Sequence, residues 1–393
     1  EANFLNGRSL MTLASGIANG YGCVLFPEGT SHNNSYMLRF RTGPMRTVLA
    51  AGALAATSDQ KLPVLIPLGL HFRQKEHFRT DVWVEYGKPI QVESNDIPNN
   101  LMEAVGDGTW SEPPAESVFR LRDNLREKLV PLSPDVHSWE EYRGLQLLGH
   151  VKGRLDGSPP KSWSHEVKLA RHFRNHFSDQ QRSLDADDLQ PPKITHPLVE
   201  KAEQAAEILH NNGLDGRDLN AQSTGLRRGN LVKTPLAISR IALFILLSPV
   251  FLLSLLPQIA LGRILGDSTD EGIDARTSYQ FLAAMFGSIT IWPISSTIIV
   301  ALLFWQSGEI DAVLGFDWTT CLGQGSIATW SSIGILWLLM FPISLLTGRL
   351  FSLVWDDYVD LRGSYRRATF SKSDKQELIS LLGEIKRELA NFD

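Results

Sequence analysis

The sequence predicts an α/β domain followed by a helical region and C-terminal transmembrane helices. Residues 1–92 contain short apolar runs bounded by proline and glycine, residues 93–230 place apolar side chains at helical spacing, and residues 231–350 hold long uncharged stretches. The 393 residues carry a net charge of −5, which argues against a nucleic-acid-binding protein. The two cysteines are too few for a disulfide scaffold or a cysteine-rich metal site.

Residues 1–92 alternate between strand and helix patterns. Residues 22–26 (GCVLF) and 63–72 (PVLIPLGLHF) are apolar runs typical of buried strands. Residues 45–56 are rich in alanine, leucine and valine and predict a helix, whereas residues 81–86 (DVWVEY) alternate as a half-buried strand does. Strand, helix and strand in this order favour crossover connections in a mostly parallel sheet.

A helical region is expected over residues 93–230. Its candidate helices, in chain order, are residues 116–129, 139–152, 165–177 and 196–211. His165, His172 and His176 fall near one face of the third candidate. A metal site there is the less favoured interpretation, because no carboxylate pair with matching spacing accompanies them.

The region 231–350 contains three segments without charge, residues 241–261, 279–305 and 327–348. Each is long enough to cross a hydrocarbon core, which takes about 20 helical residues. Buried helices of a large soluble domain are the alternative, but Trp305 and Trp330 near segment ends favour the membrane. A transporter is disfavoured because no ionisable residue within the segments marks an ion pathway.

The distribution of lysine and arginine predicts the topology. Basic residues precede the first segment and follow the third, whereas residues 306–326 contain none. The polar domain and the amphipathic helical tail, residues 351–393, are therefore expected in the cytoplasm. Three full crossings would separate the two basic ends. Since Pro249 and Pro257 can break the first segment, we expect either a hairpin plus two crossings or three segments. The tail either packs on the cytoplasmic domain or lies against the membrane.

The chemistry is concentrated in residues 26–31 (FPEGTS) and 38–43 (LRFRTG). A strand there delivers a carboxylate, a glycine and two hydroxyls, and arginines follow within a dozen residues. Backbone N–H groups of Gly29 and Thr30, together with the guanidinium of Arg41, suit recognition of an anion such as phosphate. An ordinary strand-to-loop turn with surface arginines is the alternative.

FPEGTS, then FRTG at residues 40–43, then LIPLGL at residues 65–70 resembles two motif blocks of the PlsC-like glycerolipid acyltransferases. Residues 77–90 resemble the branch that contains fungal glycerol-3-phosphate acyltransferases. The resemblance implies that residues 1–92 are the C-terminal part of such a domain. It also implies transfer of an acyl chain from acyl-CoA or acyl carrier protein to glycerol 3-phosphate, dihydroxyacetone phosphate or lysophosphatidate.

Site residues follow from the resemblance one by one. Glu28 matches the active-site block and is the catalytic candidate, and the substrate-binding candidates are Gly29, Thr30, Ser31, Arg41 and Pro67. Ser31 and His32 depart from the commoner Arg-Ser ending, so a phosphate-binding arginine is missing there. Pro67 matches the block whose implied role is to shape the acyl-donor site. No metal or tightly bound cofactor is implied.

The family's catalytic His–Asp pair, spaced HxxxxD, precedes FPEGT, but residues 1–25 contain no histidine. The spacing occurs once, at residues 210–215 (HNNGLD), in the wrong order and therefore by coincidence. We expect that an N-terminal segment has been lost or that the protein is a natural pseudoenzyme. On either interpretation, the chain alone is expected to be inactive.

The sequence thus predicts a membrane-bound acyltransferase of phospholipid biosynthesis. Its partners would be a phosphorylated glycerol acceptor, an acyl donor and membrane lipid, and no nucleic acid. The oligomeric state stays open. The alternative is a non-catalytic, membrane-anchored lipid-binding or scaffold protein that has an acyltransferase shell.

Overall fold

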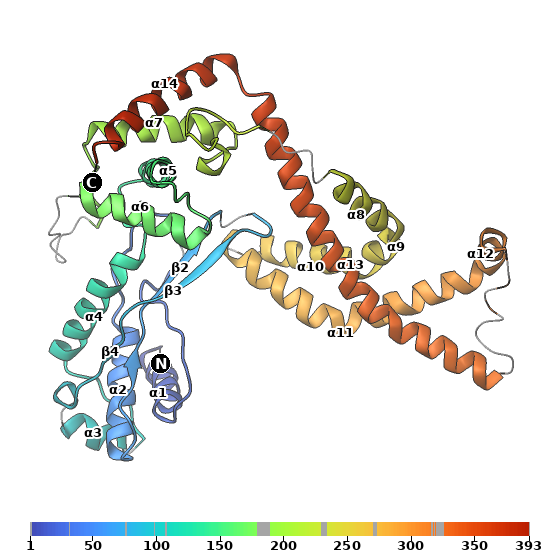
Figure 1. Cartoon of the computed structure of the whole chain (residues 1–393). Helices are drawn as coiled ribbons and strands as arrows, with labels where there is room; N and C mark the ends of the chain where they lie inside the picture. The colour runs from blue at the N-terminus through green and yellow to red at the C-terminus, as the bar shows by residue number, and fades with distance from the viewer. Residues whose placement is uncertain are drawn as a thin grey trace. The chain divides into compact units, whose positions relative to one another are not determined.

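The computed structural model describes residues 2–30, 32–74, 77–97, 99–106, 108–178, 189–228, 234–269, 273–315, 317, 319 and 326–392. The chain forms two compact units (Figure 1). Unit 1 comprises Glu1–Arg227 and Thr369–Asp393, and unit 2 comprises Arg228–Ala368. The apolar segments are therefore inserted between two parts of one polar unit.

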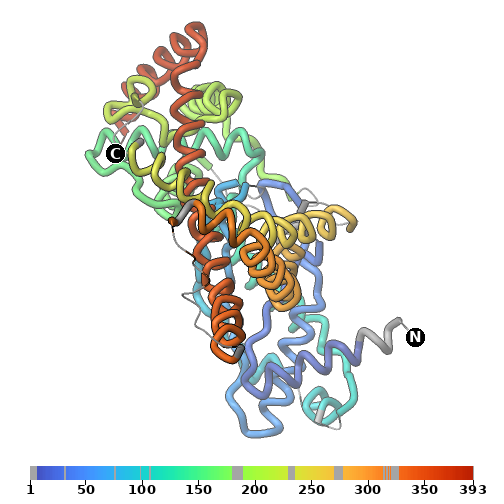
Figure 2. The backbone as a smooth tube through the Cα atoms, turned by 90° about the vertical axis from the view of Figure 1, so that its right-hand side faces the viewer, coloured from blue at the N-terminus to red at the C-terminus, as the bar shows by residue number. Residues whose placement is uncertain are grey.

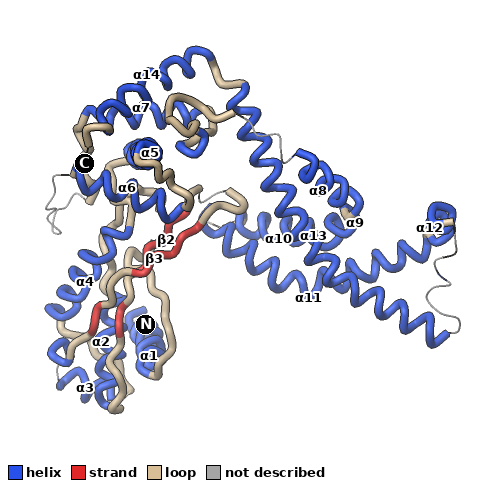
Figure 3. Tube along the Cα trace, viewed as in Figure 1, coloured by secondary structure: helices blue, strands red, loops and turns tan. Residues whose placement is uncertain are grey.

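Few strands form in the described part of unit 1 (Figure 3). Helices α1 (Ala2–Ala18) and α2 (Gly43–Thr57) precede β1 (Val64–Leu65), β2 (Leu68–Phe72), β3 (Val82–Tyr86) and β4 (Ile90–Gln91). The helix expected at residues 45–56 is confirmed as α2. The expected mostly parallel sheet is not what these strands form, because β1 pairs with β4 and β2 with β3, both antiparallel.

Residues 22–26 do not form the buried strand that their apolar composition predicts. They are extended without strand pairing, and the side chains of Val24 and Phe26 are both 69% exposed. An apolar run becomes a buried strand only where a neighbouring strand accepts its ladder hydrogen bonds. The described part of the chain offers these residues none.

The hairpin of β2 and β3 has its apolar face outward. Its register places Leu70 opposite Val84 and Phe72 opposite Val82, and these four side chains are 41–51% exposed. The other face, with His71 and Glu85, lies against helix α6 (Trp163–Phe177). Alternation therefore predicted β3 and the apolar run predicted β2, but the burial expected of residues 63–72 falls on the polar face.

The helical region is confirmed. Beyond α6 it contains α3 (Asn99–Gly106), α4 (Ala115–Leu129), α5 (Trp139–Leu155) and α7 (Pro197–Asn211), with 3₁₀ turns at Ser94–Asp96, Val130–Leu132 and Gly216–Asp218. Helices α5 and α6 begin after serine caps, because Ser138 and Ser162 accept the N–H groups of Glu141 and His165. These starts lie within two residues of those expected.

The C-terminal helix α14 (Lys372–Leu389) belongs to the core of unit 1. It lies beside α7 in both views (Figure 1, Figure 2) and also contacts α5. Its apolar face is fully buried, with Leu378, Leu382, Ile385 and Leu389 all at 0% exposure. Of the two expectations for the tail, packing on the polar domain is the one observed.

Shortening one side chain of this face tests the contribution of α14. Ile385→Val removes a methylene from a fully buried site and is expected to cost about 1 kcal/mol, or roughly 2–4 °C of Tm. Thermal unfolding of the detergent-solubilised protein, followed by tryptophan fluorescence, measures the shift. Ile379→Val is the control, because Ile379 on the same helix is 42% exposed. Equal shifts for both variants would contradict the burial of α14.

Unit 2 is entirely helical over its described residues. It contains α8 (Thr234–Leu246), α9 (Ser248–Val250), a π-helical turn (Phe251–Leu255), α10 (Leu256–Asp267), α11 (Ile273–Trp305), α12 (Ser307–Leu314) and α13 (Ser326–Ala368). Three stretches are long and apolar enough to cross a membrane: Ser248–Asp267, Ser278–Trp305 and Ile327–Ala368. Between 22% and 28% of each most apolar window is buried, so most of this apolar surface faces outward, as in a membrane protein.

Candidate functional site

The FPEGT motif forms a tight turn before α2. The N–H of Gly29 donates to the carbonyl of Phe26 at 3.2 Å, and Gly29 has a φ of +68°. This left-handed conformation is open to glycine without strain and disfavoured for residues with a Cβ. The motif therefore needs its glycine, and the turn uses the Gly29 N–H that was expected to face an anion.

The carboxylate of Glu28 closes the loop that follows the turn. Its Oε1 accepts the N–H of Leu38 at 2.6 Å and lies 2.9 Å from Nε2 of His32. Because the N–H of Asn34 donates to Nδ1 of His32 at 3.1 Å, the proton of the neutral ring is on Nε2, which donates to Glu28. Glu28 and His32 thus hold residues 28–38 together. The motif comparison gave His32 no role in holding this loop.

Arg41 comes to the same corner from the second motif. Its N–H donates to the carbonyl of Pro27 at 2.6 Å, which joins the two motifs through the backbone. Its side chain lies over Gly29, where an added Cβ would come within 3.0 Å of the Arg41 Cγ. Arg41 is exposed, and in the described part of the chain the structure gives its guanidinium no acidic partner. The corner therefore presents a solvent-accessible cation beside a glycine turn.

The remaining predicted site residues differ in how they relate to this corner. Thr30 is exposed and adjoins it in sequence, whereas Ser31 lies outside the described residues. Pro67 is buried between β1 and β2, and its carbonyl accepts the N–H of Gly87 at 2.8 Å. The structure therefore brings Glu28, Gly29 and Arg41 together and places Pro67 in the hairpin.

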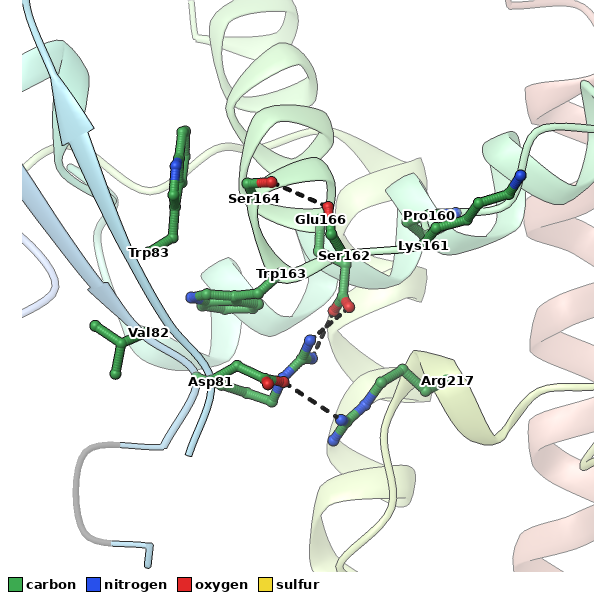
Figure 4. Close-up of a pocket in the computed structure, with 11 residues that line it drawn as sticks. Asp81, Val82, Trp83, Pro160, Lys161, Ser162, Trp163, Ser164, Glu166 and Arg217 are labelled. Carbon is green, nitrogen blue, oxygen red and sulfur yellow. Dashed lines mark hydrogen bonds and ion pairs between the residues drawn. The ribbon is translucent and has the colours of Figure 1, made fainter. Parts of the chain in front are cut away.

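A second polar cluster joins the hairpin to α6 (Figure 4). Glu166 receives two hydrogen bonds of 2.6 Å from Arg73 and lies 3.1 Å from Nε2 of His150. Burial alone would raise the pKa of Glu166, but the hydrogen bonds from His150 and Arg73 outweigh it and hold this pKa below its usual range. An open pocket of about 520 Å³ adjoins the cluster, and Asp81 and Arg217, which pair at 3.9 Å, are among its lining residues.

The next pair along the hairpin repeats this arrangement. Glu85 accepts two hydrogen bonds from Arg171, at 2.8 and 2.5 Å, and lies 3.0 Å from Nε2 of His71. Burial lowers the pKa of His71, so its neutral ring donates to the carboxylate. Since each carboxylate is held by an arginine and a histidine, the two clusters fasten the hairpin to α6 and leave no acid–base group available for chemistry.

Among the described residues, no group of three or more histidine, cysteine, aspartate or glutamate side chains is placed to hold a metal ion. The rings of His172 and His176 pack against phenylalanines instead. In the HNNGLD segment, the side chain of Asp215 accepts from the backbone N–H and the guanidinium of Arg217. This capping contact gives the segment a structural role.

Comparison with known proteins gives one partial match. A segment of 139 residues is 30% identical to Glycerol-3-phosphate O-acyltransferase 2 of Saccharomyces cerevisiae. The match covers 34% of this chain and 17% of the yeast protein, so the chain corresponds to under a fifth of that relative. No protein family model matches the chain, and no solved structure matches it.

Proposed function

We propose that this chain is part of an acyltransferase of phospholipid biosynthesis, related to the PlsC-like enzymes. It would transfer a fatty acyl chain from acyl-CoA or acyl carrier protein to glycerol 3-phosphate or a related phosphorylated acceptor. The observation that carries the proposal is the corner where Arg41 lies over the Gly29 turn, because it offers one exposed guanidinium to a phosphate. The identity to the yeast acyltransferase supports the same class of reaction.

Each residue of the corner has a part in the proposed reaction. Arg41 would bind the acceptor phosphate, and Thr30 and Ser31 are proposed as further substrate-binding residues from their place in the motif. Gly29 gives the guanidinium room to approach, and Glu28 orders the loop through Leu38 and His32. Because Oε1 of Glu28 is already engaged, we propose that this residue positions the site. Pro67 would shape the acyl-donor site from the hairpin.

The acceptor hydroxyl would attack the thioester carbonyl directly. A carbon–oxygen bond forms, the carbon–sulfur bond breaks, and the hydroxyl proton ends on the released thiol. A general base must take that proton during the attack. No HxxxxD precedes FPEGT in these 393 residues, so we expect them alone to bind the acceptor without transferring the acyl group. The apolar helices would keep the site near the membrane into which the lipid product partitions, with unit 1 on the cytoplasmic side.

An assay with labelled glycerol 3-phosphate and acyl-CoA tests the proposal. Membranes containing this chain should bind labelled acceptor. Membranes containing the natural gene product that includes this chain should also form labelled lysophosphatidate. If the chain binds no phosphorylated acceptor, and its gene product transfers no acyl group to any of them, the proposal is wrong. A membrane-anchored lipid-binding or scaffold protein would then be the better interpretation.

A further inference from the structure

The first apolar segment of unit 2 starts beside the C-terminal part of α13. Arg240 on α8 lies 3.1 Å from both carboxylate oxygens of Asp357, and the rings of Phe244 and Phe351 are 5.7 Å apart. As the residue number rises along α8, the number of its partner on α13 falls. Helix α8 therefore runs antiparallel to α13, away from the end at which α13 leaves unit 2.

After a bend at residues 247–250, the chain returns along α11. The carbonyl of Leu253 accepts the hydroxyl of Ser295, and Oε1 of Gln258 accepts Nε1 of Trp292 at 3.2 Å. Further on, a Cβ added at Gly262 would meet Gln280. The residue numbers of the contacted positions on α11 fall from 295 to 280 as the numbers along the first segment rise. Helix α10 is therefore antiparallel to α11 and runs toward the N-terminal end of α11.

Helices α11 and α13 contact each other along the middle of their apolar stretches. Nε1 of Trp337 donates to the hydroxyl of Thr297, and the rings of Trp292 and Phe341 contact each other, so the two helices are antiparallel. Beyond Ser295, where the bend of the first segment lies, α11 continues for ten residues to Trp305. At 1.5 Å per residue this is about 15 Å, or roughly half of a hydrocarbon core.

The π-helical turn that follows the bend has an identifiable cause and a satisfied backbone. Pro257 lacks an N–H group, so the carbonyl of Leu253 loses its helical partner, and residues 251–255 adopt a π-helical turn. The hydroxyl of Ser295 donates to that carbonyl at 2.6 Å. Irregular backbone at membrane depth requires such shielding by protein. Nearby polar side chains are also buried, since Ser254, Gln258 and Ser295 are each at most 5% exposed.

The lysines and arginines of unit 2 lie at one end. No lysine or arginine occurs between residues 277 and 348. Arg240 pairs with Asp357 where the chain enters and leaves, and Arg263 and Arg276 flank the turn from α10 to α11. The opposite end carries α12, with Glu309 and Asp311, and the exposed Trp305 (Figure 1). The segment after α10 therefore carries arginines, the residues that set membrane orientation, as the connectors to unit 1 do.

We propose that residues 234–267 form a re-entrant hairpin embedded in one membrane leaflet, and that only α11 and α13 cross the membrane. The outward side chains of the hairpin suit the acyl chains of that leaflet, since Ile238, Ile245, Leu246 and Ile264 are 61–73% exposed. With two crossings, both connectors emerge on the same side, as their attachment to one compact unit requires. This inference is independent of the proposed enzymatic function.

Single-cysteine labelling in sealed microsomes tests the path of the chain. In a background with Cys23→Ser and Cys321→Ser, one cysteine is introduced by Thr269→Cys, Gly308→Cys or Ser373→Cys. A membrane-impermeant maleimide is added before and after permeabilisation. Residues 269 and 373 should react from the same side, and residue 308 from the other. Labelling of residue 269 together with residue 308 would overturn the hairpin.

A depth measurement separates insertion into the leaflet from a helix lying on the surface. A spin label at Leu252→Cys should show oxygen accessibility close to that of a label at Ile298→Cys. Leu252 is 53% exposed and adjoins Leu253, whose carbonyl accepts the hydroxyl of Ser295, so both labels should lie near the membrane middle. A label at Ser373→Cys should be accessible to a water-soluble nickel reagent instead. Leu252→Cys behaving as Ser373→Cys would overturn the proposal even where the labelling side agrees.

Discussion

Arg41→Gln is expected to weaken binding of the phosphorylated acceptor by roughly 10- to 100-fold, since hydrogen bonds to charged groups contribute about 1.5–3 kcal/mol. The effect should appear in the KM for glycerol 3-phosphate in the natural gene product and in equilibrium binding to this chain. The KM for acyl-CoA should not change. The physical reason is the position of the guanidinium, which is exposed beside the Gly29 turn without an acidic partner in the described part of the chain.

Controls distinguish a bound phosphate from a general loss of positive charge. Arg8→Gln removes an exposed arginine from α1 and should leave acceptor binding unchanged. Arg41→Lys keeps the charge but loses the planar fork, so it should recover only part of the affinity. Equal acceptor affinity in the wild type and Arg41→Gln would remove Arg41 from the proposed site.

The helices could be predicted from the sequence because their signals are local. The candidates at residues 139–152 and 165–177 start within two residues of the observed α5 and α6, and the structure adds a serine cap to each. The strands were harder, since alternation shows that two faces differ but does not show which face is covered. In β2 the buried position is His71 rather than Leu70, because α6 supplies arginines to the polar face.

The candidate site, like the fold, could be predicted from the sequence only in part. The motifs placed Glu28, Gly29 and Arg41 in one corner, and the left-handed turn explains the glycine. The hydrogen bonds that Glu28 accepts from Leu38 and His32 could not be predicted, because they depend on the conformation of the loop over residues 28–38. Contacts between residues far apart in the sequence could not be predicted either. Arg73 and Glu166, for example, are 93 positions apart.

Glu166→Ala is expected to destabilise unit 1 by about 3–5 kcal/mol, because it removes the shared partner of two buried or half-buried groups. Glu166 has 6% of its side chain exposed, and Arg73 and His150 have 12% and 4%. Without the carboxylate, the guanidinium of Arg73 would stay desolvated between the Trp163 ring and Asp81, its other acidic partner among the described residues. Chemical denaturation in detergent, followed by tryptophan fluorescence, measures the change. Glu116→Ala is the control because Glu116 is exposed on α4, and a loss under about 1 kcal/mol for Glu166→Ala would contradict this account.

The same cluster predicts a pH dependence with a definite sign. The pKa of Glu166 is lower in the folded protein than its ordinary value of 4.5, so the unfolded chain binds the proton more readily. The stability that this group contributes is therefore complete above that ordinary pKa and is lost as the pH falls through the folded value. Glu166→Gln, which cannot titrate, should lower the stability at neutral pH and flatten its decline in acid. An unchanged acid slope would show that Glu166 titrates alike in both states, and the hydrogen bonds from Arg73 and His150 would then not favour its charged form.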